Sequence, residues 1–504
     1  MSDDTTPTRR VLWTAGDAAA ATGGRTAQGW AATGVTIDSR KVAPGDLFVA
    51  IQGPNFDGHA FVGSALAAGA AAALVSHVPD GLPADAPLLR VEGDTLDAMA
   101  ALGAAARARC TDARMVGVTG SVGKTGTKET LRHVLSAQGP TYATEGSLNN
   151  HWGVPLSLAR LPADSRYGVF ELGMNHAGEL GPLSRQVRPD VAVVTTIEAA
   201  HLEFFASVDA IADAKAEIFE GLNPNGVAVL NRDNPQYGRL AAAARAHGLT
   251  HVWGFGGHDD SEARLLDVSL HATCSAVTAL IRGERIQYCL SLPGKHWVMN
   301  SLAVLLAAKA LGADVATAAR SLSTLQPVKG RGTRKRIHLA QGAFTLIDES
   351  YNASPAAMLA TLEVLGKLDP GAGGRRIAVL GDMRELGERA DALHAALAEP
   401  LHAAHVDAVY ACGPHMRALF DRLPAAMRGA WTETSVELAP IVTAAAKGGD
   451  VVMVKGSLGS RTGLIVEALA ALESRADTRR TDTASTPTTT TTTAQPQAAN
   501  GQRG

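Results

Sequence analysis

The chain has 504 residues, 46% of them hydrophobic, and its 46 basic and 49 acidic residues give a formal net charge of −3. This balance excludes the strongly basic surface of a dedicated nucleic-acid binder. The four cysteines are far apart in the sequence, so neither a disulfide framework nor a cysteine-based zinc site is expected. At about 100–200 residues per domain, this length predicts about three domains.

The two ends of the chain differ in composition from the rest. Residues 1–9 lack apolar periodicity, and residues 474–504 are rich in Thr, Ala, Pro, Gln and Arg. Such segments cannot bury enough apolar surface to offset their chain entropy, so we expect both to be disordered. The polar start is not a signal peptide, and the most apolar window, residues 65–75, is shorter than the roughly 20 residues that cross a bilayer. We therefore expect a cytoplasmic protein without membrane insertion.

Between these ends, apolar β-prone runs alternate with Ala- and Leu-rich stretches of helical length. Continuous apolar strands separated by helices are typical of parallel sheets that are covered on both faces, which predicts an α/β fold. Residues 275–292 break the pattern and predict an antiparallel hairpin that turns at residues 282–284. The predicted parallel strands are residues 115–119, 167–172, 191–197, 227–230, 344–348, 376–380, 408–411 and 451–454.

Two changes of composition suggest domain boundaries. An Ala- and Arg-rich helix precedes the strand at 115–119, and a basic, Gly-containing connector covers residues 326–336. They predict a small N-terminal α/β domain at 10–110, a central domain at 111–326 and a C-terminal Rossmann-like domain at 327–473. Taken alone, the basic connector is more typical of a solvated linker than of a phosphate-binding edge.

The most informative stretch is residues 115–125, where an apolar strand runs into a Gly-rich turn and then a helix pattern. Gly120 and Gly123 permit positive φ, so successive N–H groups can form an anion cradle at a helix N-terminus. Lys124 can reach the β- and γ-phosphates, and the Thr125 hydroxyl can bind Mg²⁺. The loop glycines are three residues apart instead of the common five, but the flanking strand and helix favour nucleotide binding over a chance turn.

Polar residues follow two later strands. Glu171 ends one strand and His201 follows the next, and in an open α/β sheet such strand ends line the ligand crevice. Each alone is more typical of a surface acid or a hydrogen-bonded loop histidine; together with the phosphate loop they predict a Mg²⁺ shell. Lys215 lies in a helix pattern where a lysine is usually solvated. The sequence contains no obvious Ser-His-Asp or Cys-His arrangement, which argues against covalent acyl-enzyme chemistry.

Residues 119–125 resemble the T-G-[ST]-x-G-K-[ST] loop of the Mur ligases, which are ATP-dependent amide-forming enzymes of peptidoglycan precursor synthesis. The resemblance covers almost all of residues 35–470. Residues 348–355 resemble the corresponding motif of the family members that add the terminal dipeptide. Members that bind diaminopimelate have a D-N-P-R tetrapeptide, whereas residues 233–236 of this chain read Asp-Asn-Pro-Gln. Further matching motifs lie at residues 38–48, 57–59, 149–155, 171–175, 200–203, 381–387 and 454–461.

The resemblance is incomplete at the motif G-x-H-N-x-x-N on the adenine side. Residues 294–300 carry Trp297 at the first Asn position and retain Asn300. The resemblance therefore implies a base contact at Asn300 and none at position 297. Ala216 and Ser354 are further departures, of the kind seen between lineages.

The resemblance implies a reaction in three parts. ATP transfers its γ-phosphoryl group to the C-terminal carboxylate of UDP-MurNAc-tripeptide, the amine of D-Ala-D-Ala attacks the acyl phosphate, and phosphate leaves. The partners are thus small molecules, and the enzyme is expected to act as a monomer. A ligase that adds the third residue of the peptide, with the same fold and another amine, is the nearest alternative. A non-catalytic ATP-binding scaffold is the second alternative, although it would need no Glu171, His201 and Lys215 together.

The resemblance also assigns site residues. Lys124, His201 and Lys215 would be catalytic, and two Mg²⁺ ions would be held by Thr125, Glu171, His201 and a carbamylated Lys215. Since Arg331 and Asp348 lie in the third domain while ATP is bound by the second, the resemblance implies that the domains close around ligands. Nucleotide contacts are implied for Gly120, Ser121, Val122, Gly123, Lys124, Thr125, Gly126, Asn300, Arg331 and Asp348. Substrate contacts are implied for Ser39, Arg40, Asn149, Asn150, Tyr351 and Asn352.

Overall fold

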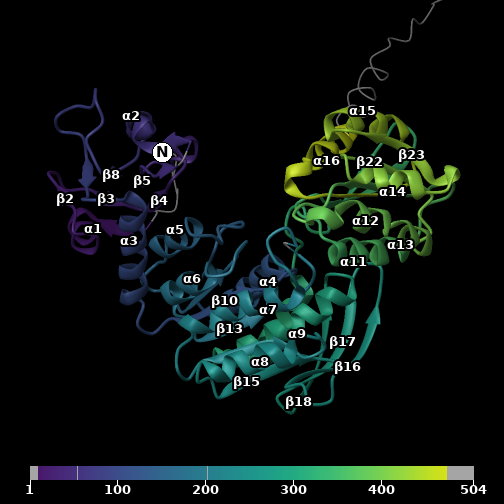
Figure 1. Cartoon of the computed structure of the whole chain (residues 1–504), viewed down its shortest axis with the longest axis horizontal. Coiled ribbons are helices and arrows are strands. Elements are labelled where there is room, and N and C mark those ends of the chain that lie inside the picture. Colours follow the sequence, from purple (N-terminus) through teal and green to yellow (C-terminus); the bar gives the residue numbers. More distant parts are fainter. Residues whose placement is uncertain (1–9, 54, 201, 474–504) are drawn as a thin grey trace, which may run out of the picture.

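The computed structural model describes residues 10–53, 55–200 and 202–473. The predicted disorder at 1–9 and 474–504 and the predicted roles of His201 lie outside the described residues. Three larger sheets follow one another along the chain, and Figure 1 shows the central one between the N-terminal and C-terminal parts, which stand apart from each other. The predicted α/β fold class is confirmed, and the domain boundaries at 110, 326 and 473 stay predictions.

The N-terminal part contains a five-stranded sheet in the order β2-β9-β8-β5-β4, parallel except for β2. β5 and β8 are buried along their whole length, which fits the apolar sequence of β8 and of β5 after Asp46. The strands are β2 Arg25–Thr26, β4 Gly34–Thr36, β5 Asp46–Val49, β8 Ala72–Val75 and β9 Leu88–Arg90, beside the short pairs β1 Trp13–Thr14 with β3 Ala31–Ala32 and β6 Gln52–Gly53 with β7 Phe56–Asp57. The helices are α1 Ala15–Thr22, α2 Val62–Ala67 and α3 Thr95–Arg109.

The central part is built on a nine-stranded sheet in the order β11-β12-β10-β13-β14-β15-β16-β17-β18. Neighbouring strands from β11 to β16 are parallel, and β16, β17 and β18 are antiparallel. The strands are β10 Arg114–Thr119, β11 Thr141–Ala143, β12 Tyr167–Glu171, β13 Val191–Val194, β14 Val227–Asn231, β15 His251–Gly256, β16 Ala263–Leu270, β17 Ser275–Ile281 and β18 Glu284–Leu290. The helices are α4 Lys124–Ser136, α5 Gly153–Ala159, α6 Leu180–Val187, α7 Val208–Ala216, α8 Tyr237–Ala246, α9 Lys295–Ala310 and α10 Val315–Ser321.

The predicted hairpin is confirmed as β17 and β18. Its turn has two residues, Arg282 at φ 49° and Gly283 at φ 89°, because Glu284 already pairs with Ile281. Two consecutive residues with positive φ match the twist of antiparallel strands and give a tighter turn than the predicted three-residue one.

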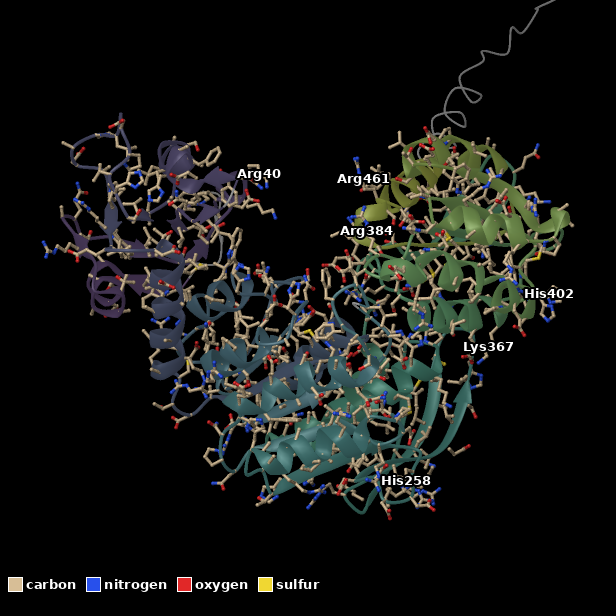
Figure 2. The ribbon with its side chains drawn as sticks, in the orientation of Figure 1. Arg40, His258, Lys367, Arg384, His402 and Arg461 are labelled. Atoms are coloured by element: carbon tan, nitrogen blue, oxygen red, sulfur yellow. The ribbon has the colours of Figure 1, made fainter. Side chains whose placement is uncertain are left out.

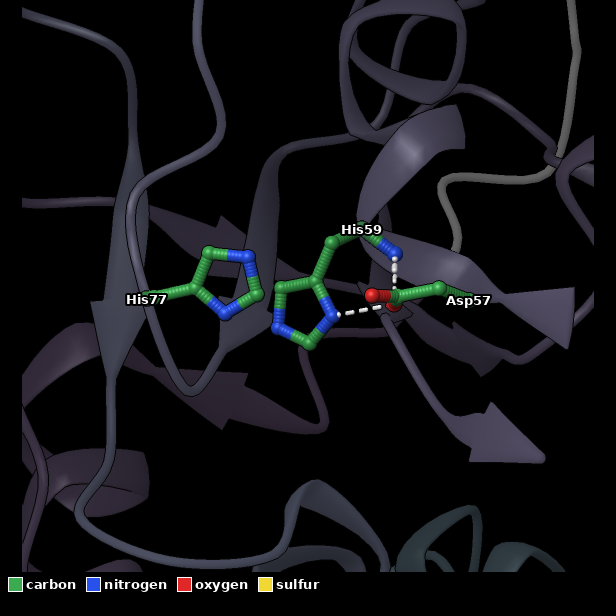
Figure 3. A group of neighbouring side chains, drawn as sticks. All are labelled: Asp57, His59 and His77. Carbon is green, nitrogen blue, oxygen red and sulfur yellow. Dashed lines mark hydrogen bonds and ion pairs between the residues drawn. The ribbon is translucent and has the colours of Figure 1, made fainter. Parts of the chain in front are cut away.

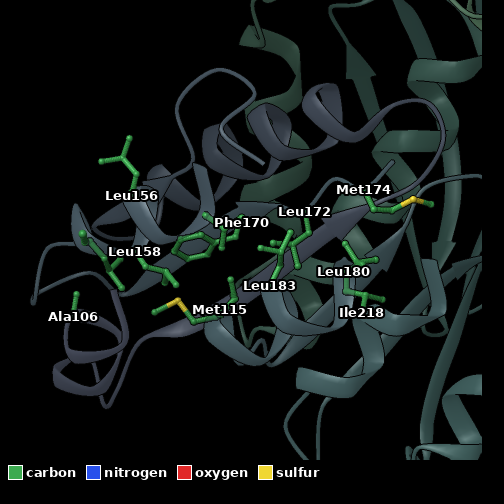
Figure 4. Close-up of a cluster of buried hydrophobic side chains, with 14 of the residues drawn as sticks. Ala106, Met115, Leu156, Leu158, Phe170, Leu172, Met174, Leu180, Leu183 and Ile218 are labelled. Atoms are coloured by element: carbon green, nitrogen blue, oxygen red, sulfur yellow. The ribbon is translucent and has the colours of Figure 1, made fainter. Parts of the chain in front are cut away.

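Apolar clusters cover both faces of the central sheet. On one face Met115 and Phe170 pack with Leu183 and Ile218, and the same cluster continues to Ala106 of α3, so α3 joins the N-terminal part to the central sheet (Figure 4). On the other face the next residues along the strands pack against α4 and α9. Burial on both faces explains why these strands show continuous apolar sequences instead of alternation.

The C-terminal part has a six-stranded sheet in the order β19-β20-β24-β21-β22-β23, in which only β19 is antiparallel to its neighbour. The prediction that the whole basic stretch 326–336 is a connector is wrong for its second half, since Thr333 begins β19 and Ile337 is fully buried. The strands are β19 Thr333–His338, β20 Ala343–Glu349, β21 Arg376–Gly381, β22 Ala408–Cys412, β23 Arg428–Thr432 and β24 Val451–Lys455. The helices are α11 Pro355–Gly366, α12 Ala390–Ala395, α13 Ala398–Ala403, α14 Met416–Arg422, α15 Ser435–Ala445 and α16 Gly463–Ala470.

Within the part of the chain that the structure describes, none of the helices combines the length and the apolar character needed to cross a membrane.

Candidate active site

The predicted phosphate loop joins β10 to α4. Gly120 at φ 142° and Gly123 at φ 91° take up backbone conformations that favour glycine, and a Cβ on Gly120 would lie 2.0 Å from Thr195 Oγ1. Gly123 precedes α4 without a side-chain cap, so the first N–H groups of the helix are available to an anion. Ser121 Oγ donates to Glu198 O at 3.1 Å, and Val122 O accepts from Thr195 Oγ1 at 2.6 Å, which fixes the loop.

Lys124 lies directly behind this loop. Its Nζ donates to Gly120 O at 2.7 Å, so the ammonium is folded back onto the turn that would hold phosphates. Burial lowers the pKa of Lys124, and the negative charge of Glu171 opposes that shift. The lysine is therefore positioned to exchange its carbonyl partner for phosphate oxygens.

Glu171, at the end of β12, has one satisfied and one unsatisfied oxygen. Its side chain is 1% exposed, and Oε1 accepts from Asn149 Nδ2 at 2.8 Å. Oε2 has no hydrogen-bond partner among the described residues. A buried carboxylate oxygen without a partner is costly, and a divalent cation with oxygen ligands would satisfy it. Together with the Thr125 hydroxyl, Glu171 fits the oxygen-rich shell that Mg²⁺ prefers.

Lys215, in the last turn of α7, is not the solvated lysine that its helix pattern favours. Its side chain is fully buried, and Nζ has no hydrogen-bond partner within 10–53, 55–200 and 202–473. Burial, together with the positive charge of Lys124, holds the pKa of Lys215 well below its usual value. An uncharged amine is the form that reacts with CO₂, so the side chain fits the predicted carbamate.

A cavity of about 570 Å³ lies between the central and C-terminal parts. This volume falls within the range of about 300–1,000 Å³ that is usual for small-molecule sites. The residues predicted from sequence that line it are Ser121, Val122, Gly123, Lys124, Thr125, Gly126, Asn149, Glu171, Asn300, Arg331, Tyr351 and Asn352.

Two side chains of the C-terminal part reach the phosphate loop region. Arg331 Nη2 donates to Thr125 Oγ1 at 3.1 Å, and its guanidinium lies 4.5 Å from the centre of the Tyr351 ring. Tyr351 in turn donates from its hydroxyl to Ser147 Oγ at 2.6 Å. Gly330 and Arg331 of the basic connector are thus part of the cavity wall, and the interpretation as a solvated linker is wrong for these two residues.

Replacing Arg331 by methionine is expected to lower kcat/KM for ATP by about 10²-fold, the scale observed when one charge-stabilising donor is lost from an active site. The variant loses the guanidinium that contacts Thr125 and keeps a long apolar side chain against Tyr351. Steady-state phosphate release measures the effect. Arg336→Met, at an exposed position of β19, is the matched control and should leave kcat/KM unchanged.

The structure does not bring Asp348 into the cavity wall. Its Oδ1 accepts from the N–H of Ser350 at 3.1 Å and from Ser350 Oγ at 2.6 Å. The neighbouring Glu349 lines the cavity instead, and burial raises its pKa. Glu349 pairs with Lys455 at 3.5 Å, and Lys455 Nζ also donates to Asn352 O at 2.9 Å.

Ser39 and Arg40 lie in the N-terminal part, away from the cavity lining. Arg40 is exposed and donates to both carboxylate oxygens of Asp38, at 2.8 and 2.9 Å, which lowers the pKa of Asp38 to about 2. In Figure 2, Arg40 lies on the side of the N-terminal part that faces Arg384 and Arg461 of the C-terminal part. The two predicted substrate residues therefore belong to a region separate from the phosphate loop.

Asn150 has a structural role in this arrangement. Its Oδ1 accepts from the N–H groups of Trp152 at 3.3 Å and Gly153 at 2.9 Å, at the start of α5. Its neighbour Asn149 holds Glu171. The pair thus supports the site, and a substrate contact by Asn150 stays a prediction.

Asp57, His59 and His77 form a polar cluster in the N-terminal part (Figure 3). His59 Nδ1 lies 2.7 Å from Asp57 Oδ1, and His59 Nε2 accepts from the N–H of Ser76 at 3.0 Å. The His59 and His77 rings stack at 4.1 Å. Because both ring nitrogens of His59 are engaged, this cluster ties loops together and leaves that histidine no free lone pair for a metal.

Sequence reasoning missed Glu349, Lys455 and Lys128. Lys128 is fully buried, and its Nζ donates to the carbonyls of Thr144 at 2.7 Å and Gly146 at 2.9 Å. It thereby holds the loop that leads to Asn149. A helical lysine gives no sign in sequence of which carbonyls it will meet, so no signal in the chain identified it.

A phosphate loop, a buried carboxylate with a free oxygen and basic side chains from a second α/β unit together define an enzyme that acts on a nucleoside triphosphate. Three family models match the chain: the Mur ligase middle domain at residues 118–308, the Mur ligase glutamate ligase domain at 334–458 and the Mur ligase family catalytic domain at 31–109. The chain belongs to the Mur ligase family, which confirms the resemblance seen in its motifs.

The relatives include enzymes named UDP-N-acetylmuramoyl-tripeptide–D-alanyl-D-alanine ligase. The one from Escherichia coli is 39% identical over 76% of this chain and 82% of its own length, and the one from Bacillus subtilis is 35% identical over 75% and 80%. Among solved structures, MurF from Acinetobacter baumannii is 31% identical, with a TM-score of 0.78 over 91% of this chain and 98% of its own. MurF ligase from Thermotoga maritima in complex with ADP is 28% identical, with a TM-score of 0.72 over 88% and 98%.

Proposed function

We propose that this Mur ligase joins the C-terminal carboxylate of UDP-MurNAc-tripeptide to the amine of D-Ala-D-Ala, with cleavage of ATP, in the cytoplasmic stage of peptidoglycan precursor synthesis. The names of relatives at 39% and 35% identity support this substrate pair. The observation that carries the chemistry is the cavity in which the phosphate loop, Glu171 and Arg331 meet. A site of this kind stabilises the negative charge that develops during phosphoryl and acyl transfer.

The phosphate groups of ATP would be held by the loop from Gly120 to Gly126 and by Lys124. Thr125 and Glu171 would hold one Mg²⁺, and His201 with carbamylated Lys215 a second. Bound Mg²⁺ would neutralise charge on the phosphate oxygens. Arg331, already in contact with Thr125, adds positive charge from the C-terminal part.

Other residues would orient the reactants. Asn149 holds the Glu171 carboxylate by its amide, and Asn300 lies beside Gly123, where it can contact the nucleotide. Asp348 Oδ1 is bonded to Ser350, so a nucleotide contact by Asp348 would be made by its other carboxylate oxygen. Substrate contacts are proposed for Ser39, Arg40, Asn149, Asn150, Tyr351 and Asn352.

Phosphate release from ATP tests the proposal. The enzyme is supplied with UDP-MurNAc-tripeptide plus D-Ala-D-Ala, or with the dipeptide precursor plus diaminopimelate or lysine. Release that requires the first pair together establishes the dipeptide-adding ligase. Release with the second pair would instead identify the third-residue-adding ligase. Binding of ATP without release from either pair would favour the scaffold.

Ligand binding is expected to reduce the radius of gyration. The acyl phosphate must be kept from water, and the predicted substrate residues lie both in the cavity and in the N-terminal part, which Figure 1 shows standing apart from the C-terminal part. Small-angle scattering with and without an ATP analogue plus UDP-MurNAc-tripeptide measures the change, and the same data give the mass expected of a monomer. An unchanged radius under saturating ligands contradicts the closure.

A further inference from the structure

The residues that line the cavity include two chemically different groups. Glu171, Asn149 and Glu198 offer oxygens and an amide. Trp297 and the alanines of α11, at positions 356, 357 and 360, offer apolar surface. A triphosphate held by the phosphate loop carries a planar, largely apolar base, and the second group is the one that matches the chemistry of that base.

Trp297 lies in the first turn of α9 and packs against α4, the helix that follows the phosphate loop. A Cβ added to Gly126 would lie 2.9 Å from Trp297 Cη2, and Asn300, one turn further along α9, lies beside Gly123. The indole is half-buried and borders both the large cavity and a smaller one that adjoins it. The contact with α4 thus fixes the edge of the indole ring, while part of the ring stays open to the cavity.

The aromatic side chain next to Trp297 adds no charge of its own. His296 also borders both cavities, and its ring lies 5.8 Å from that of Trp297. Burial, reinforced by the positive charge of Lys455, lowers the pKa of His296 to about 4, so the imidazole is neutral at physiological pH. Arg331 and Glu349 line the same two cavities, but the rings of Trp297 and His296 are uncharged, and such rings favour stacking of a base.

We propose that Trp297 is the stacking platform for the purine base of the nucleotide, beside the amide of Asn300. The inference rests on the proposed function only in that the chain binds a nucleoside triphosphate. It names a base-binding residue at a position where the family motif has an asparagine, and it assigns the base-binding free energy to a ring face instead of an amide. Stacking needs no particular pattern of donors and acceptors on the base.

Equilibrium binding of two probes tests the proposal, with Mg²⁺ present throughout. Trp297→Ala is expected to weaken binding of ATP by about 10- to 100-fold, the range found when a stacking ring is removed. Binding of inorganic tripolyphosphate, which has no base, should stay within about twofold of the unchanged enzyme. Trp297→Phe keeps a ring and should restore most of the affinity for ATP.

Fluorescence of the unchanged enzyme provides a second measurement that does not depend on how well the alanine variant folds. ATP should quench part of the indole emission and tripolyphosphate should not. The quench should vanish in Trp297→Phe and persist in Trp253→Phe, since Trp253 lies on β15 against Arg282, 4.2 Å from its guanidinium.

Three outcomes overturn the inference: ATP binding by Trp297→Ala within twofold of the unchanged enzyme, an equal loss of tripolyphosphate binding, or a quench that survives in Trp297→Phe. The second of these would mean that the indole only supports Gly126 and the loop. Failure of the proposed function would appear differently, as intact ATP binding without amide formation from any substrate pair.

Discussion

Replacing Lys215 by methionine is expected to lower kcat by about 10²–10³-fold, the loss that follows removal of one group that stabilises the transition state. The structure places the amine of Lys215 in a fully buried position with no partner among the described residues. There, reaction with CO₂ would give a carbamate and release one proton, which would convert the amine into an anionic oxygen ligand. Methionine has a similar length and volume but cannot form that ligand.

The same substitution is expected to stabilise the fold when CO₂ is absent. Because burial lowers the pKa of Lys215 in the folded state, the unfolded chain binds more protons at neutral pH, and the free energy of unfolding rises as the pH increases toward the usual pKa of lysine. Removing an unpartnered buried amine should therefore add about 1–3 kcal/mol to the free energy of unfolding. Thermal unfolding in CO₂-free buffer should show a higher midpoint, by about 2–4 °C for each kcal/mol in a domain of about 150–250 residues.

Bicarbonate separates the carbamate from a purely structural role. Adding it should raise the unfolding temperature of the unchanged enzyme and restore its activity after CO₂ removal, with no effect on Lys215→Met. Lys128→Met is the matched control, since Lys128 is equally buried but donates to the carbonyls of Thr144 and Gly146, so its loss should destabilise the fold. Activity that is insensitive to CO₂ removal would exclude the carbamate.

The two buried lysines show where sequence reasoning ends. Lys128 and Lys215 both lie in helix patterns, and although Lys128 pairs with the adjacent Glu129 at 2.6 Å, a neighbouring acid alone does not predict that a lysine is buried and held by carbonyls. The difference arises from loops distant in sequence, such as the one at 144–146 that closes over α4. Lys215 was identified as a site residue only from the resemblance to the family, and neither the resemblance nor the sequence pattern identified Lys128.

Elements whose residues are buried on both faces were predictable. The strands that became β10, β12, β13 and β14 have continuous apolar sequences, and the turn after β10 carries the glycines that its backbone requires. β19 was missed because it is an edge strand with basic, exposed residues around the buried Ile337, and its pairing with β20 is a tertiary contact.

The cavity wall was predictable only in part, for a similar reason. Asp348 and Glu349 are consecutive residues at the end of β20, and only Glu349 lines the cavity. A sequence motif locates this segment, but it does not predict which of two adjacent side chains lines the cavity. The approach of Trp297 to Gly126 joins two helices that are more than 150 residues apart and has no local signal.

Replacing Glu171 by glutamine is the second change with a large expected effect. The variant keeps an oxygen that can accept from Asn149 Nδ2, as Oε1 does now at 2.8 Å, but it loses the negative charge and the free carboxylate oxygen. We expect kcat to fall by about 10²–10³-fold and the Mg²⁺ concentration for half-maximal rate to rise. Phosphate release at increasing Mg²⁺ concentration measures both.

The fold itself should tolerate this change, which separates a role in metal binding from a structural one. Because a buried charge without a full set of partners is costly, the unfolding temperature of Glu171→Gln should be no lower than that of the unchanged enzyme. Glu198→Gln is the matched control: it also lines the cavity, burial raises the pKa of its carboxyl, and its contacts with Ser121 are made by its backbone. A Mg²⁺ dependence that shifts equally in both variants would argue against Glu171 as the ligand, because the loss would then reflect the overall charge of the cavity.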